Sequence, residues 1–166
     1  MRSTIKIVIL LFFICTSMSG ASFPDMEKYM RQHALIWEQL PMQWNEGAFL
    51  GNGLVGMMVY ADSTLNALVF HLGRPDVTDH RKAPYRKTSI GTEEADKMVD
   101  FCRLDVGKML LFPEGKILSG TFYLDIYNAE LTGHLKTDKG DLTFHAYTPQ
   151  PEEVNIVEVS SGVPYR

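Results

Sequence analysis

Stretches in which apolar and polar residues alternate dominate the second half of the chain. Between Thr121 and Leu131, the apolar residues Phe122, Leu124 and Ile126 alternate with Tyr123, Asp125 and Tyr127. In the same way, Leu142, Phe144 and Ala146 alternate with Thr143, His145 and Tyr147. A period of two residues is typical of a strand with one buried and one exposed face. We therefore expect strands at 121–131 and 142–147, with a hairpin turn at 137–141 leading into the second.

Apolar runs bounded by turn residues predict further strands. The expected strands are His33–Leu40, closed by Pro41, then Leu54–Ala61 with a bulge at Gly56, Leu65–Leu72, an extended stretch at Leu104–Phe112, and Val154–Val159. Asp62-Ser63-Thr64 supplies turn chemistry, so the second and third of these strands should form a β-hairpin. Four glycines between 47 and 56 indicate tight turns or close backbone approach there.

Helical spacing is confined to two segments. In residues 23–32, Met26, Tyr29 and Met30 fit either a short helix or an irregular lead-in. Thr92 can cap a helix that runs to about Cys102. About eight short strands and one short helix predict a mainly β fold, an antiparallel super-sandwich. Because the last predicted strand would need partners for its edges, we expect this sandwich to be incomplete.

The first 21 residues have the organisation of a secretory signal peptide. Arg2 and Lys6 precede an unbroken apolar run at Ile7–Cys15, and Ser19 and Ala21 suit a cleavage site. The run is too short for a permanent membrane span, although a buried strand or helix is the alternative. We expect a secreted or periplasmic protein with two parts, the signal peptide at 1–21 and a sandwich domain at 22–166.

Charge and cysteine content exclude several kinds of partner. The net charge is −4 and no basic stripe is present, which argues against nucleic acid. After cleavage Cys102 is the one remaining cysteine, so neither an internal disulfide nor a cysteine metal site is expected. We expect no cofactor.

The main polar cluster follows the predicted hairpin. It consists of His71, Arg74, Asp76, Asp79, His80 and Arg81. Planar guanidinium and carboxylate groups on a loop can bind sugar hydroxyls or complete the rim of a neighbouring active site. The alternative, which we favour, is a salt-bridged loop that fixes the sandwich to a companion domain. The spacing matches no dedicated metal loop.

Other candidate residues favour structural roles or exclude common enzyme classes. Trp44 lies beside the glycine-rich segment and is better placed than Trp37 to reach the surface, where it could stack on a sugar ring. Gly51-Asn52-Gly53 is best explained by a tight turn that requires positive φ. The formal dinucleotide-binding pattern ending at Gly56 lacks its strand–helix context, and no serine occupies a nucleophile elbow.

Several motifs resemble those of secreted bacterial glycoside hydrolases. The segment Trp44–Val59 is similar to the N-terminal signature of family 95, the α-L-fucosidase group. The resemblance to a neighbouring family, domain of unknown function 5703, is closer and extends through His71–Arg81, Cys102–Lys108 and Leu124–Glu130. Together the motifs cover residues from about 33 to 150.

This resemblance implies an N-terminal super-sandwich followed by an (α/α)6 barrel, which carries the catalytic acid and base in family 95. The matched positions lie in the non-catalytic domain, so no catalytic residue is carried over to this chain. We expect a non-catalytic domain that acts on carbohydrate together with a catalytic barrel, on the same or a separate chain. A free-standing glycan-binding module and a structural or non-functional fragment remain the alternatives.

Overall fold

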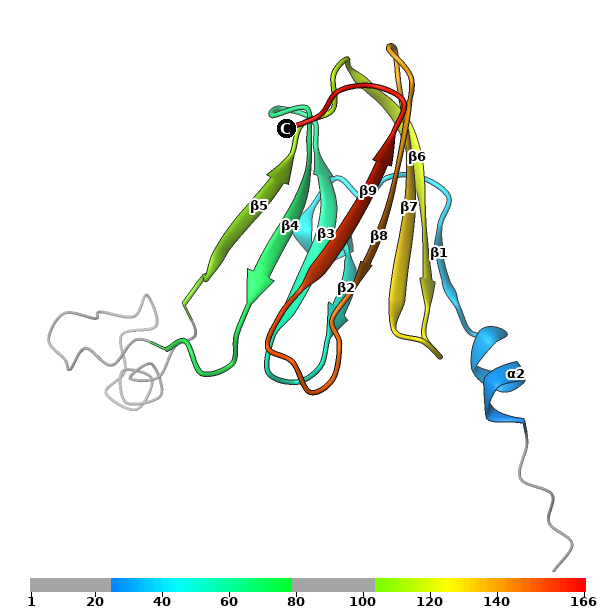
Figure 1. Cartoon of the computed structure of the whole chain (residues 1–166), viewed down its shortest axis with the longest axis vertical. Helices are drawn as coiled ribbons and strands as arrows, with labels where there is room; N and C mark the ends of the chain where they lie inside the picture. Colours follow the sequence, from blue (N-terminus) through cyan, green and yellow to red (C-terminus); the bar gives the residue numbers. More distant parts are fainter. Residues whose placement is uncertain (1–24, 79–103) are drawn as a thin grey trace, which may run out of the picture.

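The computed structural model describes residues 25–78 and 104–166, which form two antiparallel sheets. The elements are the helix α2 (Met26–Arg31), the 3-10 turn η1 (Trp44–Glu46) and the strands β1 (Leu35–Trp37), β2 (Ala48–Gly51), β3 (Gly56–Asp62), β4 (Ala67–Gly73), β5 (Gly107–Leu111), β6 (Ile117–Asp125), β7 (Glu130–Thr137), β8 (Asp141–Tyr147) and β9 (Ile156–Ser161). Figure 1 shows the two sheets as separate layers, with α2 beyond the end of β1. The predicted signal peptide and the predicted helix at 92–102 lie outside the described residues.

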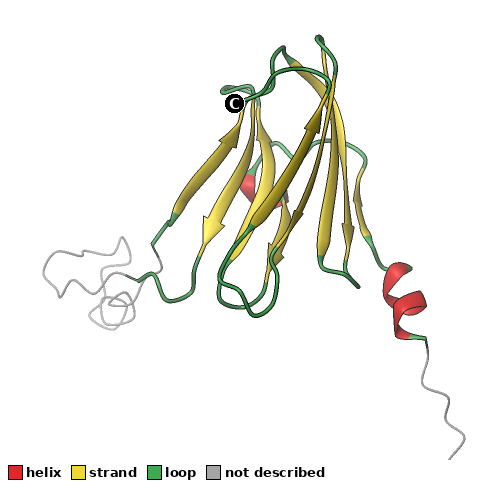
Figure 2. Cartoon of the chain, viewed as in Figure 1, coloured by secondary structure: helices red, strands yellow, loops and turns green. Residues whose placement is uncertain are grey.

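The strand order is simple in both layers. The larger sheet has the order β1-β6-β7-β8-β9 and the smaller one has the order β2-β3-β4-β5. Every neighbouring pair of strands is antiparallel. Neighbouring strands also follow one another in the chain, except where β1 pairs with β6. Figure 2 shows how few of the described residues are helical. The prediction of a mainly β, sandwich-like fold is confirmed.

One predicted strand is in fact two. The alternation from Thr121 to Leu131 crosses a turn, because β6 ends at Asp125 and β7 begins at Glu130. The Asp125 carboxylate accepts hydrogen bonds from the backbone N–H groups of Tyr127 and Asn128, which closes this turn. The apolar–polar alternation of β6 runs on into the turn through Ile126 and Tyr127, which hides the turn, although the buried positions are even-numbered in β6 and odd-numbered in β7.

The glycine-rich segment contains a strand as well as turns. This strand, β2, pairs with β3, and the predicted bulge at Gly56 is wrong. Gly56 pairs regularly with Gly51 on one side and Gly73 on the other. A Cβ atom on Gly56 would lie 2.7 Å from the carbonyl oxygen of Leu50. The glycine is therefore explained by close backbone approach.

Other local predictions hold. The hairpin of β3 and β4 forms, and the turn after Thr137 leads into β8, where Leu142, Phe144 and Ala146 are buried as expected. The helical alternative for 23–32 is correct, since α2 begins after Asp25, whose carboxylate accepts a hydrogen bond from the Lys28 N–H. The strand predicted at His33–Leu40 is shorter, at Leu35–Trp37.

Aromatic rings join the two layers through the core. Phe70 on β4 meets Phe144 on β8 edge to face, with ring centroids 5.6 Å apart. Phe144 in turn meets Phe122 on β6 at 5.4 Å, and Trp37 on β1 packs against Phe122 at 6.5 Å. Edge-to-face pairs add stability beyond the apolar area that they bury.

Gly133 makes this arrangement of rings possible. In the register of the larger sheet it lies between Phe122 and Phe144, on the face turned toward the core. A Cβ atom at this position would lie 2.1 Å from a carbon of the Phe144 ring. Only a glycine leaves the ring room to reach across to the smaller sheet.

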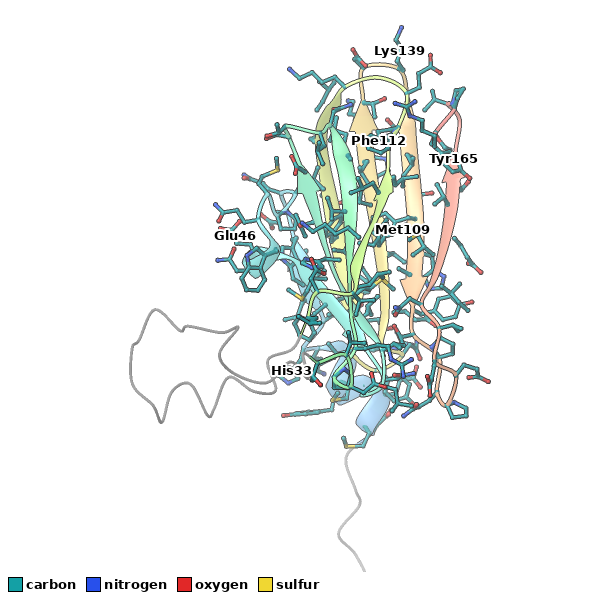
Figure 3. The ribbon with its side chains drawn as sticks, turned by 90° about the vertical axis from the view of Figure 1, so that its left-hand side faces the viewer. His33, Glu46, Met109, Phe112, Lys139 and Tyr165 are labelled. Carbon is teal, nitrogen blue, oxygen red and sulfur yellow. The ribbon has the colours of Figure 1, made fainter. Side chains whose placement is uncertain are left out.

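The C-terminal residues bridge the layers at one end of the sandwich. The backbone N–H of Phe112 donates to the Arg166 oxygen at 2.7 Å, and the Arg166 N–H returns a bond to Phe112 at 3.0 Å. The Arg166 guanidinium also lies 5.5 Å from the centre of the Phe112 ring. Figure 3 places Lys139 and His33 toward opposite ends, with Phe112 nearer Lys139. At the end near Lys139, backbone hydrogen bonds between the segments of Phe112 and Arg166 therefore hold the two sheets together.

We expect Gly133→Ala to lower the free energy of unfolding by about 3 kcal/mol, the upper end of the usual range for overpacking. The new methyl group must displace the Phe144 ring, because the clash is with the ring itself. Urea denaturation followed by circular dichroism measures the change. Gly162→Ala is the matched control, since a Cβ there meets nothing within 4 Å. Equal stability of the two variants would contradict this account of the core.

Candidate functional site

An open groove of about 870 Å³ lies at the end of the smaller sheet where β2 and β4 finish. Three of the predicted site residues, Trp44, His71 and Arg74, line it. Apolar side chains of β2, β3 and the intervening loop form much of the remaining wall, among them Phe49, Leu54 and Met58. The structure therefore brings these three predicted residues together, although they are up to 30 positions apart in the sequence.

Trp44 is the most exposed aromatic residue among the described residues that line this groove. It begins the turn η1 and has 62% of its surface exposed. The turn is fixed from below, because the indole N–H of Trp37 donates to the Glu46 oxygen at 2.9 Å. Gly47 follows the turn, and a Cβ there would lie 2.8 Å from the Val59 oxygen, so the turn sits directly against β3. The expectation that Trp44 rather than Trp37 reaches the surface is confirmed.

Arg74 is held by two acidic residues. Its Nε and Nη2 donate to the two carboxylate oxygens of Asp76, both at 2.8 Å, and its Nη1 donates to Glu153 at 2.6 Å. The hydrogen bonds from Arg74 lower the pKa of Asp76, and those to Asp76 and Glu153 raise the pKa of Arg74. Glu153 belongs to the loop between β8 and β9, so Arg74 links the ends of the two sheets. The loop is therefore salt-bridged within the sandwich, and the favoured interpretation, that it fixes the sandwich to a companion domain, stays a prediction.

His71 pairs with a carboxylate that the sequence did not single out. Its Nε2 lies 2.7 Å from Oδ1 of Asp105, which also accepts a hydrogen bond from the backbone N–H of Gly107. The hydrogen bond with His71 lowers the pKa of Asp105. When Nε2 carries the proton, Nδ1 remains as an acceptor for a ligand hydroxyl. Asp105 was missed because it is 34 positions away, and only the pairing of β4 with β5 makes it a neighbour.

Asn52, at the centre of the Gly51-Asn52-Gly53 motif, fixes the groove to the larger sheet. Its Nδ2 donates to the backbone oxygens of Pro149 and Glu152, at 2.8 and 2.7 Å. Its Oδ1 accepts from the backbone N–H groups of Leu54 and Val55. Gly53 has a φ of 91°, so the tight-turn interpretation of the motif is confirmed. Asn52 joins two loops almost 100 residues apart.

Of the remaining predicted site residues, the structure describes one, Asp76. It lies at the edge of the groove, bound to Arg74. Asp79, His80 and Arg81 lie outside the described residues. Within residues 25–78 and 104–166, no group of three or more His, Cys, Asp and Glu side chains is placed to hold a metal ion.

The groove offers binding groups: an exposed indole, an imidazole and a guanidinium. Asp105 is the one carboxylate among the described residues that line it. Acid–base hydrolysis of a glycosidic bond normally requires two carboxyl groups at a set separation. The described residues of the groove present one carboxyl group beside the indole, the imidazole and the guanidinium.

No protein-family model matches the chain, and no curated protein matches it either. Among the described residues, none of the helices has the length and apolar character needed to cross a membrane.

Acid should weaken the contacts around the groove. The pKa of Asp76 and of Asp105 is lower in the folded chain than the ordinary value of 3.8. Both contacts therefore stabilise the fold at pH values above about 4, and this stabilisation is lost as the pH falls through the folded-state pKa values. We expect Asp76→Asn to melt at a lower temperature than the wild type at pH 7, and the difference to shrink toward pH 2.

Thermal unfolding followed by circular dichroism across this pH range makes the measurement. Glu46→Gln is the control, because no side-chain hydrogen bond or ion pair is found for Glu46, which is exposed. A difference between wild type and Asp76→Asn that stays constant with pH would contradict the role given to the ion pair.

We expect Asn52→Ala to destabilise the fold by about 2 kcal/mol or more, since each of its four side-chain hydrogen bonds contributes roughly 0.5–1.5 kcal/mol. Asn45→Ala is the control, because Asn45 is exposed on η1 and has no such bonds. Chemical denaturation compares the two. If both substitutions cost the same, Asn52 does not join the sheets as described.

Proposed function

We propose that this chain is the non-catalytic sandwich domain of a secreted protein that acts on carbohydrate, and that the groove beside Trp44 contacts the sugar. The observation that carries the proposal is the exposed indole of Trp44, supported from below by Trp37 and flanked by polar groups. The motifs of the Trp44–Val59 segment, which resemble glycoside hydrolases, agree with this function.

The chemistry of the groove suits a sugar. A sugar ring has an apolar face of C–H groups, which packs on an aromatic plane, and a rim of hydroxyls, which needs directed hydrogen-bonding partners. Trp44 provides the plane. His71 and Arg74 provide the polar groups, and both are held in place by carboxylates, Asp105 and Asp76. Groups fixed before the ligand arrives lose less entropy on binding.

A companion catalytic domain is part of this proposal. The smaller sheet has apolar side chains on its outer face as well as toward the core. Phe49 is 55% exposed there, and Met58 and Leu110 are half-buried. Apolar surface of this kind is typical of an interface. We infer that the (α/α)6 barrel expected from the family resemblance, on this or a separate chain, packs against this face beside the groove, so that the groove opens at the boundary between the two domains.

A free-standing glycan-binding module is the second candidate. It is supported by the quality of the core, since no buried side-chain nitrogen or oxygen in the described part of the chain is left without a hydrogen-bond partner. A self-contained core of this kind needs no companion to satisfy its polar groups. Purification of the native protein with its partners, followed by mass determination, separates the two candidates.

Loss of the Trp44 ring should remove sugar binding without unfolding the protein. We expect Trp44→Ala to weaken binding to the best ligand of a broad glycan array by about tenfold or more, while its melting temperature stays close to that of the wild type. Trp44→Phe should retain part of the affinity, because it keeps an aromatic plane. Isothermal titration calorimetry on the purified chain measures both.

Tyr29→Ala is the matched control, since Tyr29 is also an exposed aromatic residue, 51% exposed, but lies on α2. The proposal fails if no glycan binds the wild-type chain, or if Trp44→Ala and Tyr29→Ala bind equally well.

A further inference from the structure

The outer face of the larger sheet carries two rows of mainly polar side chains, which do not belong to the groove. One row crosses all five strands and contains Ile36, Tyr123, Thr132, His145 and Glu158. The adjacent row contains Thr121, His134, Thr143 and Ser160. With strands about 4.8 Å apart, the first row is about 19 Å long. These residues line an open hollow of about 720 Å³, which is within the size range of ligand sites.

The polar groups of this face are oriented by one another. His145 lies between two carboxylates, with its Nδ1 3.3 Å from Glu158 and its Nε2 3.2 Å from Glu130. The hydroxyl of Tyr147 donates to Glu158 at 3.5 Å, and its ring lies 5.1 Å from that of His145. The face therefore presents fixed donors and acceptors in the middle of the sheet.

An apolar patch lies at one end of the first row. Ile36 is 66% exposed and Tyr123 is 39% exposed, and the two residues are direct cross-strand neighbours. The patch and the polar rows together match a molecule with apolar C–H faces and many hydroxyl groups. The backbone groups within the sheet are already paired between strands, so side chains alone select the ligand.

The charge of the face limits what it can bind. Acidic side chains exceed basic ones there, with Glu38, Glu130, Asp141 and Glu158 against Lys136. This excess repels anionic polymers. The carboxylates of Glu130, Asp141 and Glu158 each lie within 3.3 Å of a histidine, which occupies a position that a ligand cation would need at these three residues.

We propose that the outer face of the larger sheet is a second glycan-binding surface, which takes an uncharged polysaccharide chain across its strands. Tyr123 packs on one sugar ring, and the side-chain oxygens of Glu158, Thr132 and Thr143 accept hydrogen bonds from the hydroxyls of the same ring and its neighbours, while His145 holds the Glu158 carboxylate in place. The class of ligand rests on the proposed function, but the surface and its residues are separate from the groove, so the two can be tested apart.

The test measures binding of soluble polysaccharides to the full chain by affinity electrophoresis and calorimetry. The probes are the uncharged polymers xyloglucan, galactomannan and laminarin, with the anionic polymer polygalacturonate as comparison. Each outer-face variant is made in the wild type and in Trp44→Ala, which removes the groove contact. Tyr123→Ala deletes the ring and Tyr123→Phe restores it. Thr132→Arg fills the hollow from an exposed position, in case Tyr123→Ala fails to fold.

We expect Trp44→Ala to retain binding of at least one uncharged polymer, and Tyr123→Ala or Thr132→Arg in that background to weaken it about tenfold. Tyr123→Phe should retain it, and polygalacturonate should not bind. If Trp44→Ala alone abolishes all binding, the second surface is refuted while the proposed function stands. If only the outer-face variants lose binding, the second surface is upheld and the role of the groove fails. If no polymer binds, or if polygalacturonate binds equally well, the inference is overturned.

Discussion

The packing of the Phe144 ring over Gly133 is the contact on which the two-layer structure depends. It lets a side chain of the larger sheet pass its neighbouring strand and reach Phe70 on the smaller one. Protein cores are close-packed and leave no free volume for an added methyl group here. Such a group would therefore push the layers apart. The burial of Phe122, and through it the support of Trp37, follows from the same arrangement.

The position of the groove follows from how the layers are joined at that end. Asn52 and Arg74 both bind the loop between β8 and β9, so residues of the smaller sheet are held by residues of the larger one. Trp37 extends this support from β1 to the turn that carries Trp44. An exposed tryptophan on a short turn would otherwise be free to move, and a mobile ring is a poor binding platform because binding must first order it.

The described residues of the predicted polar cluster have different roles, which follow from their hydrogen-bond partners. Arg74 and Asp76 use their charges on each other and on Glu153, so they chiefly fix the loop. His71 is oriented by Asp105 but keeps one ring nitrogen for other contacts. In the part of the chain that the structure describes, no hydrogen bond or aromatic contact uses the Trp44 ring, which makes Trp44 the best candidate for ligand contact. Arg74 and Asp76, which the sequence marked as candidate ligand-binding residues, thus make the most side-chain hydrogen bonds among the described residues of the cluster.

The sequence by itself determined the fold class and the burial of individual strands. Alternation with a period of two, as in Leu142, Phe144 and Ala146, follows from strand geometry and needs no knowledge of neighbours. It also indicated that Trp44 would be exposed and that Gly51-Asn52-Gly53 forms a turn. The turn that separates β6 from β7 was missed, because the apolar–polar alternation of the sequence runs on past Asp125 to Ile126 and Tyr127, although the buried positions change from Phe122 and Leu124 in β6 to Leu131 and Leu135 in β7.

Only the tertiary structure decided which distant residues meet. The pairing of His71 with Asp105, of Arg74 with Glu153 and of Asn52 with the β8–β9 loop depends on strand register and on how the layers face each other. The same holds for the polar rows across the outer face of the larger sheet, whose members come from five strands. A local pattern records which side of a strand a residue faces, whereas neighbours across a sheet are set by the global arrangement of the chain.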